Sequence, residues 1–195
     1  MYKIEFDEER HLYYVDGKLT PSVSQIIRNV LKNDEPIPDY AKPAMERGTY
    51  IHKVIHKALT SNLDESSIDK SVIGYFDSWK LWYKECGLKM ELSEKILYEP
   101  EGDYCLTIDY VGKDSAGGRH LLDWKTGQIY STYGPQLGGY EVGYIANYLS
   151  PVKIACIQLF KNGIIAKTHY YDDFECMEDW NAINRVYKLR KKKIL

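Results

Sequence analysis

Two β-rich segments that flank a short flexible turn constrain the fold of this chain more than any other feature. Segment 104–112 (YCLTIDYVG) and segment 119–126 (RHLLDWKT) are separated by the sequence KDSAGG. β-Branched and aromatic residues favour strands, and a short glycine-containing connection between two such runs is typical of a β-hairpin. We therefore predict an antiparallel hairpin in the middle of the chain.

The other segments predict a sheet covered by helices. Further strands are expected at 90–99 and in a second hairpin, 152–171, which turns around Lys161–Gly163, while two short strands around an acidic turn begin the chain. Apolar residues at helical spacing predict helices near 22–31, 42–59, 67–87, 133–149 and 173–192. This order predicts a single α/β domain with a central mixed β-sheet: an N-terminal hairpin and helices over about 1–60, a core over about 68–172 and a C-terminal helix over about 173–192.

Apolar spacing also predicts which side of each helix is buried. In the first helix the buried side should be formed by Val23, Ile26, Ile27, Val30 and Leu31. In the second it should be formed by Ala44, Ile51, Ile55 and Leu59. The aromatic residues of the third helix lie at helical spacing and are expected to line the core or a groove: Phe76, Trp79 and Tyr83.

Composition narrows the class of protein. The chain has 195 residues, 44% hydrophobic content and a net charge of −2, which are ordinary values for a soluble domain. No apolar run has the length of a membrane helix, and the start MYKIEFDEER lacks a signal-peptide core, so we expect a cytoplasmic location and no membrane partner.

The four cysteines are far apart (residues 86, 105, 156 and 176), which argues against structural zinc and an iron–sulfur cluster. The basic run 188–193 (KLRKKK) is interpreted as a solvated helix end, with phosphate contact as the alternative.

The central hairpin carries the candidate chemistry. Because side chains alternate along a strand, Asp123 and Lys125 should project from the same face, and Asp109 can come alongside them. The face of Asp109 should include Thr107 and Val111, and the opposite face Leu106, Ile108 and Tyr110. Two carboxylates and a lysine suit Mg²⁺ or Mn²⁺, which prefer oxygen ligands and complete their shell with water and phosphate. The alternative is a cross-strand Asp–Lys ion pair, worth at most about 1 kcal/mol at a surface.

Three other segments contribute candidates. His52 lies on an amphipathic helix, and His56 follows four residues later, although no HExxH glutamate accompanies them. Glu94 precedes the hairpin and can join the same edge of the sheet. On the helix after the hairpin, Gln136, Tyr140 and Tyr144 form one stripe, and a stripe of small residues (Gly139, Gly143, Ala146) predicts close packing, most simply against the sheet.

Taken in order, the segments RGTYIH, SEKILY, LTIDYVG, LLDWKTG and PQLGGY resemble the PD-(D/E)xK nuclease superfamily, in particular its RecB-like branch with many phage-type exonucleases. LTPSVSQII near the N-terminus is similar to the opening of those phage proteins, and the resemblance covers roughly residues 20–159. It implies a restriction-endonuclease-like core. It also implies that one or two Mg²⁺ or Mn²⁺ ions are held by His52, Asp109, Asp123 and the Trp124 carbonyl, with Glu94 as an accessory ligand.

The same resemblance assigns catalytic roles to Asp109, Asp123 and Lys125, with Lys125 acting on the attacking water, and gives Gln136 and Tyr140 a role in substrate positioning. The chain departs from the family pattern at Ile108, where the named proline would stand, and at Leu106, where a small residue is usual. We expect altered packing at Leu106 and no loss of chemistry. The cysteines do not match the iron–sulfur exonucleases of this branch.

The function expected from these features is metal-dependent exonuclease cleavage of DNA phosphodiester bonds, in phage-type recombination or repair. The alternatives are a structure-specific endonuclease and a non-catalytic DNA-binding recombination protein on the same fold. Aromatic residues are candidates for stacking on splayed bases: Trp79, Trp82, Tyr140 and Tyr144. By analogy, a single-strand annealing protein is the candidate protein partner, and assembly into a homo-oligomer is compatible with such an enzyme.

Overall fold

The computed structural model describes residues 2–32, 35, 38–150 and 152–192 of the chain. Its strands and α-helices run in chain order as β1 (Ile4–Asp7), β2 (Leu12–Val15), β3 (Lys18–Thr20), α1 (Val23–Lys32), α2 (Lys42–Leu59), α3 (Ile73–Glu85), β4 (Lys89–Glu99), β5 (Tyr104–Lys113), β6 (Arg119–Lys125), α4 (Tyr133–Tyr148), β7 (Lys153–Gln158), β8 (Lys167–Tyr170) and α5 (Asp173–Lys191). Short 3₁₀ helices lie at Asp39–Ala41 and Glu65–Ser67.

The central sheet has five strands in the order β4-β5-β6-β7-β8. The predicted central hairpin is present as antiparallel β5 and β6, and the second hairpin as antiparallel β7 and β8. β6 and β7 are parallel because α4 connects them as a crossover helix. The expected α/β fold with a central mixed sheet flanked by helices is therefore confirmed. A separate three-stranded sheet, β1-β2-β3, precedes it, and its third strand was not predicted because three residues carry no alternation.

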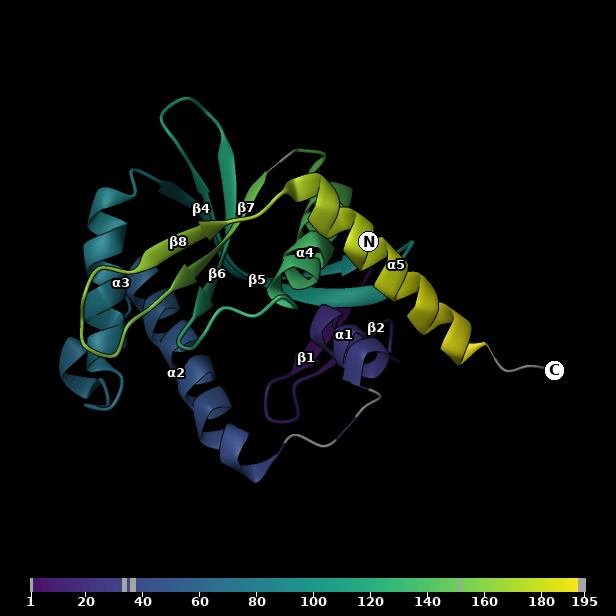
Figure 1. Cartoon of the computed structure of the whole chain (residues 1–195), viewed down its shortest axis with the longest axis horizontal. Coiled ribbons are helices and arrows are strands. Elements are labelled where there is room, and N and C mark those ends of the chain that lie inside the picture. Colours follow the sequence, from purple (N-terminus) through teal and green to yellow (C-terminus); the bar gives the residue numbers. More distant parts are fainter. Residues whose placement is uncertain (1, 33–34, 36–37, 151, 193–195) are drawn as a thin grey trace.

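Helices cover both faces of the central sheet (Figure 1), and each face carries a hydrophobic core. One is formed with α1, α4 and α5, and its members include Val23, Leu137 and Trp180. The other is formed with α2 and α3, and includes Ile51 and Phe76. No helix in the described part of the chain is both long and apolar enough to cross a membrane.

Helix faces agree with the predicted spacing except at the helix ends. Val23, Ile26 and Ile27 of α1 are buried, but Leu31 is 48% exposed in the last turn of the helix. In α2, Ile51 and Ile55 are fully buried, whereas Ala44 is exposed, because the first turns of this helix extend beyond the core. Residues near a helix end can keep the apolar period while having no element to pack against.

The predicted alternation along β5 is wrong at its centre. Leu106, Ile108 and Val111 all belong to the core beneath α4, while Tyr110 belongs to the core beneath α2 and α3. The change of side occurs at Asp109, next to an irregular position of β4: Ser93 pairs with Tyr110 and Lys95 with Ile108, and the intervening Glu94 has a left-handed φ of +49°. A left-handed residue within a strand interrupts the pleat. Side chains on the two sides of such a position therefore do not follow the regular alternation between the two faces of the sheet.

The first half of β5 leaves β6 and lies against the N-terminal sheet. Its ladder with β6 ends at the pair Tyr110–Leu122. Before that point, the Cys105 N–H donates to the Pro21 carbonyl at 2.8 Å, and the hydroxyls of Tyr13 and Thr107 share a hydrogen bond of 2.8 Å. The separation of β5 from β6 opens the space in which the candidate site lies.

Glycines allow α4 to approach its neighbours closely. A Cβ on Gly143 would lie 2.6 Å from a methyl of Leu106, so the leucine side chain on β5 is accommodated by the missing side chain of Gly143. Gly139 instead faces Trp180 of α5 and Val23 of α1, and Ala146 is exposed. The predicted packing of the glycine stripe against the sheet therefore holds at Gly143 but not at the other two positions.

We expect Gly138→Ala to destabilise the fold strongly. A Cβ there would lie 2.0 Å from the backbone carbonyl oxygen of Cys176, which cannot move aside as a flexible side chain could. Overpacking of this kind costs about 2 to 3 kcal/mol of unfolding free energy. Gly127→Ala is the matched control, since nothing lies within 4 Å of its Cβ. Urea unfolding of the two variants measures the difference; equal stabilities would show that α4 and α5 can separate without cost.

The Glu141 side chain on α4 is expected to make stability fall with rising pH. Glu141 is 2% exposed, and one carboxyl oxygen has no partner among the described residues. Burial, with a smaller contribution from Asp173, raises the pKa of Glu141 from 4.5 to about 8. Between these two values the folded chain holds a proton that the unfolded chain has released, so the free energy of unfolding decreases as pH rises.

Glu141→Gln removes this titration and should stabilise the protein at pH 9 more than at pH 5, by on the order of 1 to 2 kcal/mol. Glu178→Gln, at an exposed position of α5, is the control and should keep the pH dependence of the wild type. Urea titrations at the two pH values test the expectation, which is wrong if Glu141→Gln gives the same stability difference at both.

Candidate active site

The candidate site begins where β5 and β6 separate. The β5–β6 ladder ends before Trp124, so no backbone carbonyl of β5 pairs with the Trp124 N–H. The Asp109 carboxylate accepts a hydrogen bond from this N–H at 2.9 Å instead. The side chain thus takes the place of a strand carbonyl, which fixes the carboxylate at the edge of the opening. Burial acts to raise the pKa of Asp109, but the His52 imidazolium and smaller contributions from Lys125 and the Trp124 N–H lower it overall.

His52 is placed by α2, whose neighbouring residues Ile51 and Ile55 are anchored in the core. Its Nε2 donates to the Trp124 carbonyl at 2.9 Å, and its Nδ1 lies 3.3 Å from an Asp109 carboxylate oxygen. Both ring nitrogens therefore face acceptors, which favours the doubly protonated ring. Burial opposes that charge, but the nearby carboxylates, Asp109 above all, raise the pKa of His52 to about 9.

Glu94 lies on β4, where its backbone is left-handed, and its side chain is directed into the site. Its Oε1 is buried and has no hydrogen-bond partner among the described residues. Burial and then the Asp109 carboxylate raise the pKa of Glu94 to about 8. The preceding residue, Ser93, shares a hydrogen bond of 3.0 Å with His56 Nδ1. His56 therefore anchors β4 to α2 beside the site, and it is directed at Ser93 and not at the partners of His52.

Asp123 and Lys125 form a buried ion pair on β6, as their shared face predicted. Burial acts to lower the pKa of Lys125, but the Asp123 carboxylate outweighs it and keeps the ammonium charged. Burial raises the pKa of Asp123 despite that ammonium. The Lys125 Nζ also lies 4.2 Å from the Tyr133 ring centre and donates to Gln136 Oε1 at 3.2 Å.

Gln136 links the lysine to α4. Its amide nitrogen donates to the Tyr140 hydroxyl at 2.8 Å, so Lys125, Gln136 and Tyr140 form one chain of hydrogen bonds. Base stacking by the predicted aromatic residues is not compatible with their burial. Trp79, Trp82 and Tyr144 are 4%, 8% and 2% exposed, and Tyr140 is 9% exposed. Helical spacing alone could not distinguish a core tryptophan from one lining a groove.

The structure divides the predicted residues into two adjoining groups. Ligand atoms of His52, Glu94 and Asp109 all lie within 4.8 Å of one another, which suits a metal ion. Asp123 is directed at Lys125, and the Trp124 carbonyl accepts from His52.

Two contacts of the site were not foreseen from the sequence. Tyr133 contacts Lys125, and the Cys156 thiol lies 3.9 Å from an Asp123 oxygen. Tyr133 precedes Gln136 by three residues on one helix, a spacing that would have found it. Cys156 faces Asp123 through the β6–β7 pairing, which the sequence does not reveal.

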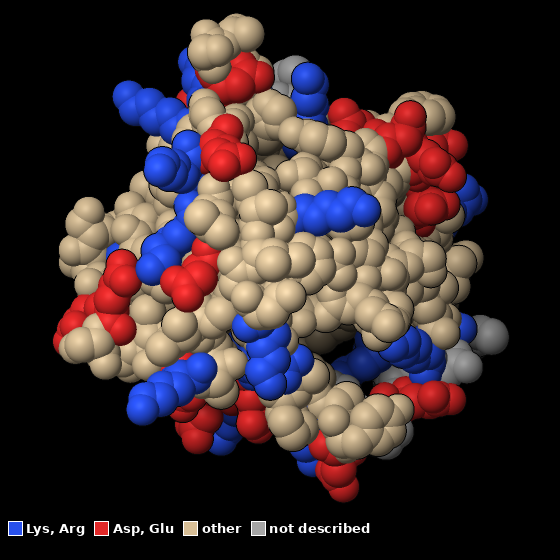
Figure 2. Space-filling model, turned by 60° about the vertical axis from the view of Figure 1, so that its left-hand side comes forward, with Lys and Arg blue, Asp and Glu red and all other residues tan. Residues whose placement is uncertain are grey.

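One face of the molecule carries charges of both signs. Figure 2 shows Lys and Arg side chains interspersed with Asp and Glu, and a hollow whose border includes Lys and Arg. This mixture fits the net charge of −2.

No protein-family model matches the chain, and sequence comparison with curated proteins gives no match either. Among solved structures, the chain is similar to a protein of Eubacterium rectale named "Putative exonuclease". The TM-score is 0.56 at 11% sequence identity, and the match covers 89% of this chain and 83% of the other. At this identity the likeness shows a shared fold.

Proposed function

We propose that the chain is a Mg²⁺- or Mn²⁺-dependent DNA exonuclease of the PD-(D/E)xK, RecB-like type, formed as one catalytic domain. The observation that supports the proposal is the position of the His52, Glu94 and Asp109 ligand atoms next to the Asp123–Lys125 ion pair, where β5 and β6 separate. The bond from Trp124 N–H to Asp109 and the buried pair of Asp123 with Lys125 are its geometric support. The exonuclease name of the E. rectale neighbour agrees with it.

The residues present fit a hard divalent cation. Glu94 Oε1 is a buried, unpartnered carboxylate oxygen, and it lies with His52 and Asp109 in the set of close ligand atoms. Carboxylate oxygens with one imidazole suit Mg²⁺ or Mn²⁺. His52 and Glu94, each after the loss of one proton, would hold the ion together with Asp109, with Asp123 and the Trp124 carbonyl on the adjoining side. A bound ion supplies charge neutralisation at the phosphate and lowers the pKa of a water.

Lys125 is the residue best placed to act on the reacting groups. It is cationic and held on three sides by Asp123, Gln136 and the Tyr133 ring, so its ammonium is preorganised to orient a water and to stabilise charge on the phosphate. Gln136 and Tyr140 then position Lys125, and through it the substrate. The recombination or repair role, an annealing-protein partner and a homo-oligomeric state rest on the family resemblance alone.

A DNA degradation assay with Mg²⁺, Mn²⁺ or EDTA tests the proposal. We expect mononucleotides to be released from linear DNA in the presence of metal, and no release in EDTA. Cutting of closed circles would indicate an endonuclease instead. DNA binding with no cleavage of either substrate under any metal condition would indicate a non-catalytic DNA-binding protein, and the proposed activity would be rejected.

A further inference from the structure

The segment between β6 and α4 places an exposed aromatic ring close to Lys125. Tyr130 lies in this segment and is 56% exposed, and Tyr133 is the first residue of α4. The Tyr133 ring centre lies 4.2 Å from the Lys125 Nζ, and the ring centres of Tyr130 and Tyr133 are 5.7 Å apart in an edge-to-face arrangement. Two contacting rings therefore lead from the Lys125 ammonium to the surface.

The backbone that carries Tyr130 is anchored on both sides. The Tyr133 N–H donates to the Tyr130 carbonyl at 3.1 Å, which closes a turn at the start of α4. Earlier in the segment, the Gln158 amide nitrogen donates to the Gly127 carbonyl at 2.9 Å, and Ile129 packs against the core beneath α4. Little further ordering is therefore needed before the Tyr130 ring can bind a flat group.

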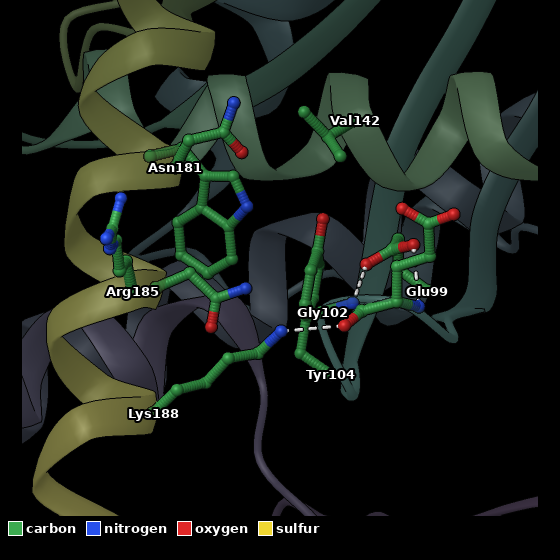
Figure 3. Close-up of a pocket in the computed structure, with 10 residues that line it drawn as sticks. Glu99, Gly102, Tyr104, Val142, Asn181, Arg185 and Lys188 are labelled. Carbon is green, nitrogen blue, oxygen red and sulfur yellow. Dashed lines mark hydrogen bonds between the residues drawn. The ribbon is translucent and has the colours of Figure 1, made fainter.

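The pocket between α4, α5 and the turn that joins β4 to β5 lacks such a ring among the residues described along its walls (Figure 3). Its aromatic residues, Tyr104 and Trp180, are fully buried and pack edge-on against each other. Lys188 on its rim donates to the Glu101 carbonyl and so ties the turn to α5. A flat ligand therefore finds no free ring face in this pocket, in contrast to the surface at Tyr130.

An exposed tyrosine ring close to a fixed ammonium suits a nucleotide whose base has a free face. Aromatic side chains bind nucleic acid by stacking on bases, and every base can stack because each has a π-face. Within a duplex both faces of a base are covered by its neighbours, whereas an unpaired base or a base at a strand end has a free face. One sugar joins base and phosphate, so a phosphate at Lys125 would bring a nearby base within reach of Tyr130.

We propose that Tyr130, supported by Tyr133, stacks on the base of an unpaired or terminal nucleotide, and that the site thereby favours DNA ends and single strands over the interior of a duplex. This inference rests on the proposed function, because it takes the reacting phosphate to lie at Lys125. Tyr130 is then a specificity-determining residue, and Tyr133 positions both the Tyr130 ring and the lysine.

The test uses DNA that carries 2-aminopurine, a fluorescent base whose emission falls when it stacks on an aromatic ring. The wild-type chain is titrated in EDTA, where no metal-dependent cleavage interferes. The DNAs are a single strand and a blunt duplex labelled at the terminal nucleotide, and a duplex labelled internally. We expect a saturable fall in emission from a terminal label and no change from the internal label. No change at either terminal label, or an equal change at the internal one, overturns the proposal.

Variants at position 130 separate the ring from the rest of the side chain. Tyr130→Ala should weaken binding of the labelled end about tenfold, which is about 1.4 kcal/mol and lies within the range for stacking of one base on an aromatic ring. Tyr130→Phe keeps the ring and should match the wild type. Tyr170→Ala is the control, because it removes a ring that is 62% exposed on β8, at the edge of the sheet. Equal affinity of Tyr130→Ala and the wild type, or binding by Tyr130→Phe as weak as by Tyr130→Ala, overturns the proposal.

Single-turnover cleavage with Mn²⁺ separates this inference from the proposed function. Tyr130→Ala should raise the protein concentration that gives the half-maximal rate and leave the maximal rate unchanged. If the wild type cuts DNA and Tyr130→Ala has the same concentration dependence, the contact with the base is rejected and the nuclease activity is retained. If the wild type binds labelled ends and cuts no DNA, the nuclease activity is rejected and the contact with the base is retained.

Discussion

Lys125→Met is expected to reduce metal-dependent DNA hydrolysis about 10²- to 10³-fold, since removing one preorganised electrostatic contact to a reacting group commonly costs this much. Methionine keeps the length of the side chain but removes the ammonium that Asp123, Gln136 and Tyr133 hold in place. Single-turnover cleavage of end-labelled DNA measures the loss. A variant that keeps more than a tenth of the wild-type rate would show that Lys125 is only a structural ion-pair partner.

Folding and metal binding must be checked in the same variant. Asp123 loses its partner, but burial already raises the pKa of its carboxyl, so the group can take up a proton and the domain should remain folded. When Asp123 takes up a proton, the lost cation and the lost anion cancel, so the net charge of the site is unchanged and Mn²⁺ affinity should be retained. Lys113→Met, at an exposed end of β5, is the matched control and should leave the cleavage rate unchanged. Circular dichroism and calorimetry separate loss of chemistry from loss of fold.

The sequence predicts the components of the site better than their contacts. Alternation along β6 correctly places Asp123 and Lys125 on one face, because this part of the strand keeps a regular ladder with β7. It fails on β5, where the left-handed backbone of Glu94 and the separation from β6 turn Asp109 toward Trp124. Such a backbone state depends on contacts between distant segments, among them the bond between His56 and Ser93, so residue type alone does not reveal it.

The same limit applies to the aromatic residues and to the glycines. Trp79 and Trp82 fit a groove or a core equally well by spacing, and only the position of α3 against the sheet decides for the core. The glycine stripe of α4 signals close packing, but which element approaches depends on where α5 lies, and α5 follows it by two strands. The spacing of apolar and small residues along a helix predicts which face of the helix is buried. Which element packs against that face depends on the three-dimensional arrangement.

Asp109→Asn is expected to weaken Mn²⁺ binding at least about 100-fold and to abolish cleavage, because a divalent cation loses a charged oxygen ligand. The asparagine oxygen can still accept the Trp124 N–H, so β5 and β6 should keep their geometry. Asp179→Asn, on the exposed side of α5, is the control for removal of a carboxylate elsewhere. Calorimetric Mn²⁺ titration of the three proteins measures the effect.

The histidine beside Asp109 provides a second measurement that needs no metal and no DNA. In the wild type, burial lowers the pKa of His52, and the Asp109 carboxylate is the largest influence that raises it, to about 9. With asparagine at 109 the burial remains and the main counter-charge is lost, so the pKa of His52 should fall by at least about one unit. NMR titration of the imidazole protons follows this change. If the His52 pKa stays near 9 while Mn²⁺ affinity is also unchanged, Asp109 is neither the partner of His52 nor a metal ligand.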